Sequence, residues 1–288
     1  MRAHPRNETA QGGNESYCSP FLKWPGGKRR LATRLLALLP HGRRLIEPFV
    51  GAGAVFAASD FPEYVLADAN PDLISLYRSL REQPDELLRA SQRLFEDADG
   101  AVHAYYERRE RFNALPLGIE RAALFVYLNR FGFNGLCRYN RAGEFNVPAG
   151  RFTVTPALPL EQMVQWSIKL QRVELRDGDF ASTLLEARSG DVVFCDPPYS
   201  PTATADCFAN YTGAGFTWDD HLRLVATAKD LAGRGIPVLI TNHDTAATRE
   251  LYCGATLFRL EAHRSIGSRA LSRVKVPEVA AVFSDVAL

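Results

Sequence analysis

Short apolar runs alternate with amphipathic stretches toward both ends of this chain, and glycines or prolines separate them. Runs of β-prone residues bounded by turn residues predict buried strands, whereas leucines recurring every three or four residues predict helices. Strands that alternate with helices are typical of a parallel sheet with both faces covered, so we expect an α/β fold. The expected strands are 44–49, 64–67, 172–175, 191–195, 237–240 and 279–283.

The middle of the chain has a different pattern. Over residues 71–158 the apolar positions follow helical spacing among many charges, and no clear strand occurs. Such a stretch between two strands of one sheet indicates an inserted helical subdomain. We therefore expect a polar, disordered tail over 1–18, a sheet domain formed by 19–70 and 159–288, and a helical insert over 71–158.

Charge is unevenly distributed along the chain. The 288 residues are 46% hydrophobic and 23% charged with a net charge of +1, as expected of a globular protein. Residues 23–44 nevertheless hold seven Lys or Arg and no acid, and residues 121–151 and 259–275 each hold five basic residues and one acid. These clusters favour a polyanionic partner such as nucleic acid, although charge runs also occur on ordinary solvated surfaces.

Membrane and metal proteins are not indicated. No apolar run approaches the roughly 20 residues of a membrane span, and the polar start lacks the apolar core of a signal peptide. The five cysteines are widely spaced, no Cys-x-x-Cys occurs, and the six histidines complete no metal-ligand pattern. We therefore expect an intracellular protein with free thiols, no metal and no membrane partner.

Asp196-Pro197-Pro198-Tyr199 directly follows the apolar strand 191–195. The prolines end the strand and fix the directions of their carbonyls, because each holds φ near about −65°. A carboxylate, a rigid carbonyl and an aromatic ring then meet at the edge of the sheet where open α/β folds bind ligands. This set suits a planar molecule with an exocyclic amine. Asp196 and the Pro197 carbonyl would accept hydrogen bonds from the two N–H groups of the amine, while Tyr199 stacks on the ring. A plain proline turn is the alternative.

A glycine turn marks a second candidate site. Gly51 and Gly53 follow the first strand, and Asp68 ends the next strand 17 residues after Gly51. A strand, a glycine turn, a helix and a terminal acid form a Rossmann-like half that binds nucleosides, with the acid placed for ribose hydroxyls. The full G-x-G-x-x-G pattern fails at Phe56, which argues against a dinucleotide. A nucleoside without a pyrophosphate, such as S-adenosylmethionine, fits better.

Two further polar motifs lie at the ends of expected elements. Gly26-Gly27-Lys28 precedes the leucine-rich helix and offers free N–H groups, a helix dipole and an ammonium to an anion. The spacing does not match a P-loop, so a carboxylate fits better than a triphosphate. Asn242-His243-Asp244 ends the strand 237–240, where structural hydrogen bonding is favoured over acid–base chemistry.

Aromatic, Asn and Arg residues are interleaved over 127–148, in the second half of the insert. Such a segment offers stacking, base-edge hydrogen bonds and phosphate contacts together. Aromatic core packing with Asn turns is the alternative, but so many Asn and Arg side chains would be hard to satisfy in a core. The segment therefore favours a nucleic-acid interface.

Taken together, these motifs resemble the Dam-type DNA adenine-N6 methyltransferases over nearly all of 21–283, in the order cofactor motif, recognition domain, catalytic motif. The resemblance implies a Rossmann-like S-adenosylmethionine-dependent methyltransferase domain with an inserted helical DNA-recognition subdomain. It further implies methylation of adenine N6 in double-stranded DNA, usually within GATC. The stretches that carry the resemblance are 21–28, 47–53, 66–68, 129–140, 143–148, 196–199 and 242–244.

The resemblance also implies roles for individual residues. Arg138 would read a guanine edge, and Phe133 would fill the gap left by a flipped adenine. The expected catalytic residues are Asp196, Pro197, Pro198 and Tyr199. The expected cofactor-binding residues are Trp24, Lys28, Phe49, Gly51, Gly53, Asp68, Asp179, Phe180 and Asp196. The residues expected to face DNA are Lys23, Phe133, Asn134, Leu136, Arg138, Pro148 and Arg151.

The chain departs from the family pattern in two places. The family often has Tyr where this chain has Phe131 and Phe133, so stacking is kept but a hydroxyl contact is lost. Many members have a Ser-Asn-Gly-like loop where this chain reads Gly-Ser-Arg-Ala-Leu over 267–271. Arg269, Arg273 and Lys275 nevertheless keep that loop basic.

The expected chemistry is direct attack of the amine on the sulfonium methyl, positioned by the protein, with no metal and no covalent enzyme intermediate. Cytosine-C5 methylation is disfavoured because the chain has no Pro-Cys pair for a nucleophile. Cytosine-N4 enzymes typically have Ser before the two prolines, and protein-glutamine and many RNA methyltransferases favour Asn there, where this chain has Asp196. Another recognition sequence, or a non-catalytic DNA-binding module, stays open. We expect a monomer in the bacterial cytoplasm, bacterial or phage-encoded.

Overall fold

The computed structural model describes residues 18–97, 102–199, 215–263 and 275–285. The tail expected over 1–18 lies outside this part, except for Cys18, whose backbone N–H donates to the Ala57 carbonyl at 3.1 Å.

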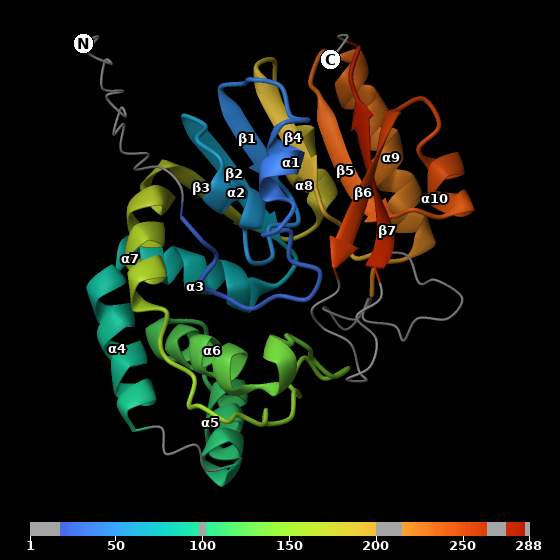
Figure 1. Ribbon diagram of the computed structural model, residues 1–288. Coiled ribbons are helices and arrows are strands. Elements are labelled where there is room, and N and C mark those ends of the chain that lie inside the picture. The colour runs from blue at the N-terminus through green and yellow to red at the C-terminus, as the bar shows by residue number, and fades with distance from the viewer. Residues whose placement is uncertain (1–17, 98–101, 200–214, 264–274, 286–288) are drawn as a thin grey trace, which may run out of the picture.

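A seven-stranded sheet forms the centre of the upper part in Figure 1, in the order β3-β2-β1-β4-β5-β7-β6. The first five strands in this order are parallel, whereas β7 runs antiparallel to both of its neighbours. The chain order reverses between β1 and β4, so their C-terminal ends form the switch point at which such sheets bind ligands. The strands are β1 (Arg44–Glu47), β2 (Glu63–Asp68), β3 (Val173–Asp177), β4 (Asp191–Cys195), β5 (Val238–His243), β6 (Thr256–His263) and β7 (Lys275–Phe283).

Helices cover both faces of the sheet and form a separate layer beyond the C-terminal ends of its parallel strands (Figure 1). The α/β class expected from the sequence is confirmed. The helices are α1 (Ala32–Leu36), α2 (Ala54–Ala58), α3 (Pro71–Glu82), α4 (Pro84–Glu96), α5 (Val102–Ala114), α6 (Ile119–Phe131), α7 (Leu160–Lys169), α8 (Phe180–Leu185), α9 (Trp218–Gly233) and α10 (Ala246–Leu251), with short 3₁₀ turns at Phe133–Gly135 and Leu170–Arg172.

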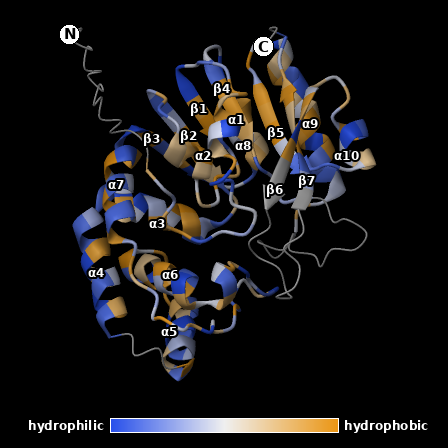
Figure 2. Ribbon diagram, viewed as in Figure 1, coloured by the Kyte–Doolittle hydropathy of each residue, from blue (hydrophilic) through white to orange (hydrophobic). Residues whose placement is uncertain are grey.

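Alternate residues of each parallel strand point to opposite faces, and this alternation divides the core in two. In β1, Leu45 packs with α1, α2 and α3, whereas its neighbour Ile46 packs with α8 and α9. In β4, Val192 and Val193 divide in the same way. The middle residues of β1, β2, β4 and β5 are therefore apolar on both faces (Figure 2), which is why the sequence shows apolar runs there.

The helical insert shares one hydrophobic core with the sheet. The buried stretch Leu124–Leu128 of α6 belongs to the same cluster as Leu45 and Phe56 beside the sheet, and α3 packs against both parts. Hydrophilic and hydrophobic residues alternate along the ribbon of α4 (Figure 2), as expected of a helix with one face in the core. The insert is therefore rigidly supported on its sheet-facing side.

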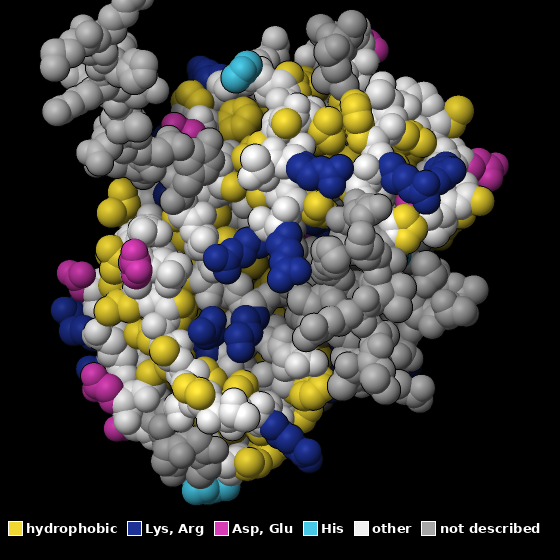
Figure 3. Space-filling view, viewed as in Figure 1, with side chains coloured by type: hydrophobic (Ala, Val, Ile, Leu, Met, Phe, Trp, Pro, Cys, Tyr) yellow, Lys and Arg dark blue, Asp and Glu magenta, His cyan; other side chains and the backbone are white. Residues whose placement is uncertain are grey.

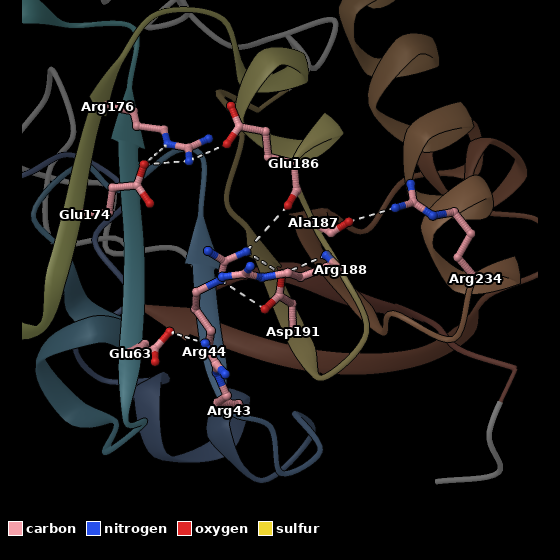
Figure 4. Close-up of polar contacts among 10 residues, drawn as sticks. All are labelled: Arg43, Arg44, Glu63, Glu174, Arg176, Glu186, Ala187, Arg188, Asp191 and Arg234. Carbon is pink, nitrogen blue, oxygen red and sulfur yellow. Dashed lines mark hydrogen bonds and ion pairs between the residues drawn. The ribbon is translucent and has the colours of Figure 1, made fainter.

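A buried ion pair joins the starts of β1 and β4, at the edge opposite the switch point (Figure 4). The Arg44 guanidinium donates to both carboxylate oxygens of Asp191, at 3.0 and 2.7 Å, and to the Glu186 carbonyl at 3.5 Å. The fork-to-fork geometry satisfies both charges away from water. This contact fixes the register of the two strands that carry the site at their other ends.

Several strands differ in extent from the sequence prediction: β1 ends at Glu47, β3 continues to Asp177, and β7 begins at Lys275. The strand β5 continues beyond Ile240 to His243, because Thr241, Asn242 and His243 are buried and pair with β7 despite being polar. The edge strand β6 was not predicted, since polar residues interrupt its apolar ones; it is paired along its length with β7. Within the described residues, no helix is both long and apolar enough to cross a membrane.

Candidate active site

The Asp196 carboxylate lies directly after β4, where it contacts the loop before α1 on one side and the strand β5 on the other. The Lys28 ammonium, from the loop before α1, lies 2.9 Å from Oδ1 of Asp196 and also donates to the Gly26 carbonyl at 2.9 Å. The Thr241 hydroxyl, from the neighbouring strand β5, donates to the same Oδ1 at 2.6 Å. Within the part of the chain that the structure describes, no hydrogen bond occupies Oδ2. One oxygen is thus fixed by the protein, and the other is left for a further donor.

Tyr199 lies beside this carboxylate and is held from two sides. Its hydroxyl donates to the Glu278 carboxylate of β7 at 3.0 Å, and its ring meets the His243 ring edge-to-face at 4.5 Å. The Lys28 ammonium lies 4.6 Å from the centre of the Tyr199 ring. Burial, with Asp196 and Glu278 nearby, raises the pKa of Tyr199 well above its ordinary value, so the hydroxyl stays a donor.

Three charged side chains of the described residues meet here, Lys28, Asp196 and Glu278. Lys28 is buried at 4% exposure and has two carboxylates near it, with Glu278 at 3.9 Å and Asp196 at 2.9 Å. One ammonium against two carboxylates leaves a net charge of −1, which favours a cation in the same region.

The glycine turn after β1 forms the second half of the site. Gly51 and Gly53 have φ of 47° and 61°, a region that residues with a Cβ seldom adopt. A Cβ on Gly51 would meet the Trp24 indole nitrogen at 2.8 Å, so the Trp24 ring packs directly on this turn. The Tyr77 hydroxyl of α3 donates to the Gly51 carbonyl at 2.6 Å. The turn is thus buried, and its neighbours fix its conformation.

Asp68, at the end of β2, closes this turn. Its carboxylate accepts from the backbone N–H of Gly51 and from that of Asn70, both at 3.0 Å. Burial raises the pKa of Asp68 to about 6, although the two backbone donors oppose that shift. An ionised carboxylate next to a glycine turn is suited to accept the two hydroxyls of a ribose.

Glu47 is a buried carboxyl group at the end of β1. One of its oxygens has no hydrogen-bond partner among the described residues, and burial raises its pKa to about 8. Lys169 of α7 is buried near it and donates to the carbonyls of Ala57 and Ser59 at 3.1 and 2.5 Å, and burial lowers its pKa to about 8. The Glu47 side chain is therefore held protonated near neutral pH, directly before the glycine turn.

Three phenylalanine rings lie on the other side of the turn. Phe49 contacts Phe180 of α8 at 5.3 Å and Phe216 at 5.5 Å between ring centres. The Asp179 carboxylate, in contrast, caps α8 by accepting from the Ala181 N–H at 2.9 Å and pairs with Arg223 at 2.9 Å. Phe49 and Phe180 thus offer an apolar wall for a planar ring, whereas the Asp179 side chain is already used by the protein.

The loop that carries Lys23 is fixed to the insert by Asn129 of α6. The Asn129 side chain accepts from the Lys23 N–H at 2.9 Å and donates to the Lys23 carbonyl at 2.7 Å. The Lys23 ammonium lies 5.7 Å from the centre of the Phe152 ring, and burial and the nearby Arg130 lower its pKa. This contact joins the segment leading to Lys28 to the part of the insert rich in Asn and Arg.

The segment after α6 forms a short hairpin, with Tyr139 bridged to Phe145. Asn134 adopts φ of 55°, and the neighbouring Phe133 is 40% exposed. The Arg138 guanidinium donates to the Asn146 side chain at 2.8 Å and to its carbonyl at 3.3 Å, so this exposed side chain is pre-oriented.

The residues expected to face DNA mostly do lie at the surface. Leu136 is the exception, being buried at 8% exposure, and Lys23 is half-buried. Of the two phenylalanines that replace tyrosines of the family, Phe131 is buried and stacks on Tyr127 at 4.3 Å, whereas Phe133 is exposed. The exposed members of the set are Phe133, Asn134, Arg138, Pro148 and Arg151.

Basic side chains gather on one face of the molecule. In Figure 3 the Lys and Arg side chains lie over the middle of that face, between the sheet and the helical insert, whereas acidic side chains lie at its margins. A positive band of this kind suits a polyanion that spans both parts. The basic loop with Arg269 and Arg273 lies outside the described residues.

The prediction from the sequence did not include two polar residues that contact the site. Thr241 and Glu278 touch Asp196 and Tyr199, but both lie on strands far along the chain, and a polar residue within a strand carries no functional signal by itself. Structural hydrogen bonding was favoured for Asn242-His243-Asp244, and Asn242 does donate to the Tyr252 hydroxyl at 3.0 Å. Among the described residues, no group of three or more His, Cys, Asp or Glu has metal-binding geometry.

An α/β sheet with a glycine turn and a half-satisfied carboxylate at its switch point is the arrangement of a nucleoside-dependent enzyme. The sequence matches the family model of the D12 class N6 adenine-specific DNA methyltransferases over residues 24–266. This chain belongs to that family, so it is an adenine-specific DNA methyltransferase, and the membership expected from its motifs is confirmed.

Curated relatives are similar in sequence to this chain along almost its whole length. The DNA adenine methylase of Vibrio cholerae serotype O1 (strain O395) is 43% identical over 265 residues, which cover 92% of this chain and 95% of that protein. The DNA adenine methylase of Escherichia coli (strain K12) is 44% identical over 263 residues, covering 91% and 94%. That of Haemophilus influenzae (strain Rd) is 42% identical over 268 residues, covering 92% and 93%.

Proposed function

We propose that this enzyme transfers a methyl group from S-adenosylmethionine to N6 of adenine in duplex DNA, within GATC, after flipping the adenine out of the helix. The observation that carries the proposal is the state of Asp196, whose Oδ1 is fixed by Lys28 and Thr241 while Oδ2 is left for a donor. An exocyclic amine supplies such a donor. The names of the curated relatives support the same reaction.

The glycine turn fits S-adenosylmethionine. Asp68 would accept the ribose hydroxyls, Phe49 and Phe180 would flank the adenine ring, and Trp24 would line the turn at Gly51. When bound, this cofactor supplies a methyl group activated by a sulfonium cation. The net negative charge of Lys28, Asp196 and Glu278 would favour that cation without an added metal.

The protein's part in the chemistry is to orient the amine. Oδ2 of Asp196 and the Pro197 carbonyl would accept the two N–H groups, which draws the N6 lone pair out of conjugation with the ring. Pro198 keeps the backbone stiff, and the Tyr199 ring would stack on the base. Asp196, already hydrogen-bonded to N6, is suited to accept the proton that N6 loses. Positioning would supply most of the rate enhancement.

The exposed hairpin supports sequence reading. Arg138, pre-oriented by Asn146, would donate to the O6 and N7 atoms of a guanine, and Phe133 would fill the gap left by the flipped adenine. Extrusion of a base costs a few kcal/mol, which the remaining contacts must offset. Lys23, Asn134, Leu136, Pro148 and Arg151 complete the proposed DNA-binding set.

We propose residues 71–158 as the recognition subdomain, with 19–70 and 159–288 forming the catalytic domain. The hairpin that follows α6 and the exposed side chains of the set above support this division. The enzyme would act as a monomer. It would work in the cytoplasm of a bacterial cell, and the bacterial organisms of its relatives support this location.

The test uses purified protein with methyl-labelled S-adenosylmethionine and two sets of unmethylated duplexes, one with GATC and one with that sequence scrambled. After digestion to nucleosides, label in N6-methyladenine only from the GATC set supports reaction and target together. Label from both sets would keep the reaction and contradict GATC reading by Phe133 and Arg138. Label in cytosine, or none in DNA, would overturn the proposal.

An Asp196→Ala variant separates the enzyme from a non-catalytic DNA-binding protein. The enzyme would lose turnover while keeping its affinity for the duplex. A non-catalytic DNA-binding protein would show no turnover before or after the substitution, and its affinity for the duplex would not change.

A further inference from the structure

The first residues of α3 lie between the glycine turn and the recognition hairpin. The backbone N–H of Asn70 donates to the Asp68 carboxylate at 3.0 Å. The Asn70 side chain caps the helix, since its oxygen accepts from the N–H groups of Asp72 and Leu73 at 3.0 and 3.3 Å. A carboxylate that faces the proposed ribose position is therefore bonded directly to the residue that starts α3.

The hairpin is bonded to the same residues from the other side. The Tyr139 hydroxyl donates to Oδ2 of Asp72 at 2.7 Å and lies 3.4 Å from the Asn70 side-chain oxygen. The Asn70 amide donates to the Cys137 sulfur at 3.4 Å. Both contacts flank Arg138, whose own side chain points to Asn146. The backbone that carries Arg138 is thus fixed on each side by the start of α3.

This set of contacts is buried and saturated. Asn70, Asp72 and Cys137 are exposed by 3%, 5% and 1%. The Asp72 charge is balanced by Arg121, which donates to its two oxygens at 2.6 and 3.2 Å. Leaving a buried polar group without its partner is costly, so these side chains do not exchange partners freely. A displacement of Asn70 at the cofactor side therefore requires a matching displacement of the hairpin at Cys137 and Tyr139.

We propose that Tyr139 is a positioning residue that couples the cofactor site at Asp68 to the DNA-reading hairpin, so that cofactor and duplex bind with positive cooperativity. The inference rests on the proposed function. Ribose hydroxyls bound to Asp68 would restrain Asn70 and, through Asn70, the hairpin. The DNA would then lose less conformational entropy of the protein when it binds. By linkage, each ligand raises the affinity for the other by the same factor.

The variant that tests this is Tyr139→Phe. It keeps the ring that packs edge-to-face on Phe145 at 5.7 Å and removes only the hydroxyl. Calorimetric titration gives the dissociation constant of S-adenosylhomocysteine with and without a saturating hemimethylated GATC duplex. We expect the duplex to tighten binding by about five-fold or more in the parent enzyme, a typical coupling factor, and by less than about two-fold in the variant. Each ligand alone should bind both proteins with similar affinity.

Tyr105→Phe is the matched control. The Tyr105 hydroxyl also bonds the segment that follows the hairpin, donating to the Val147 carbonyl at 3.0 Å, but it makes no contact with α3. Arg109 donates to the same carbonyl at 3.2 Å, so loss of the Tyr105 hydroxyl leaves it satisfied. This variant should keep the coupling of the parent enzyme.

Cys137→Ala is the second variant, which removes the acceptor of the Asn70 amide and should lower the coupling factor in the same direction. Equal coupling in the parent and in both α3-contact variants would overturn the inference, as would absence of coupling in the parent. If neither ligand binds the parent protein at all, the proposed function fails and this inference with it. Loss of coupling in the Tyr105 control would also contradict the specific role of Tyr139.

Discussion

The Thr241 hydroxyl donates to Oδ1 of Asp196 at 2.6 Å, joining two neighbouring strands at the switch point of the sheet. Lys28 approaches the same oxygen at 2.9 Å. The two donors hold Oδ1, which leaves Oδ2 as the oxygen proposed to accept from the substrate amine. The orientation of Asp196 is thus set by β5 and the loop before α1 rather than by Asp196 alone.

Substitution Thr241→Val should lower kcat about ten-fold with little change in KM for the duplex. A hydrogen bond to a charged group contributes about 1.5–3 kcal/mol, and part of that would be lost when Asp196 is free to rotate. Steady-state kinetics on a GATC duplex measures the effect. Thr227→Val on α9, whose hydroxyl donates to the Arg223 carbonyl at 2.9 Å, is the control and should leave kcat unchanged. An unchanged kcat in Thr241→Val would show that Lys28 alone orients the carboxylate.

Cofactor affinity should fall below about pH 6, the value to which burial raises the pKa of Asp68. The ionised carboxylate accepts two hydroxyls, and protonation removes one acceptor, so binding weakens as pH falls. If only the ionised form binds, the dissociation constant of S-adenosylhomocysteine rises about ten-fold between pH 7 and pH 5. Titrations across this range measure it. Asp68→Asn should bind weakly with no such step, and a step that persists in this variant would assign the proton elsewhere.

Stability should decrease as pH rises from about 5 to about 8, because burial raises the pKa of Glu47 to about 8 in the folded protein. The folded state then holds the Glu47 proton more tightly than the unfolded chain, so unfolding is favoured as protons become scarce. The contribution is present below the unfolded pKa and is lost as pH passes the folded one, with a size of a few kcal/mol. Urea unfolding of Glu47→Gln should show a smaller pH slope over this window. Equal slopes would mean that Glu47 is ionised in the fold.

Asn129→Ala should weaken both cofactor binding and folding. Its side chain bonds both backbone groups of Lys23, at 2.9 and 2.7 Å, and so fixes the loop that leads to Lys28. The loss of two such bonds costs about 1–3 kcal/mol of unfolding free energy.

The control is Asn113→Ala, whose side chain bonds the backbone of Phe145 in the same way, at 2.8 and 3.1 Å, but lies within the insert. It should cost similar stability and leave the affinity for S-adenosylhomocysteine intact. Similar loss of cofactor affinity in both variants would show a general effect of stability rather than of the Lys23 loop.

The local pattern of the chain predicted the parts of the site that lie close together in sequence. The apolar run 191–195 followed by Asp196 and two prolines indicated a strand with a polar end, and Gly51, Gly53 and Asp68 indicated a nucleoside turn. Both follow from local rules, since strands read as apolar runs, prolines stop them, and positive φ requires glycine. The same motifs were sufficient to indicate the family.

The tertiary structure alone decided which distant residues complete the site. Thr241 meets Asp196 across 45 residues, Glu278 meets Tyr199 across 79, and Tyr139 meets Asp72 across 67. No periodicity records such pairs, because strand order and the packing of the insert on α3 bring them together only after the core has formed. A threonine inside a strand and a glutamate near the end of the chain look ordinary in the sequence. Their positions depend on the order β4-β5-β7, which places Thr241 against Asp196 and Glu278 against Tyr199.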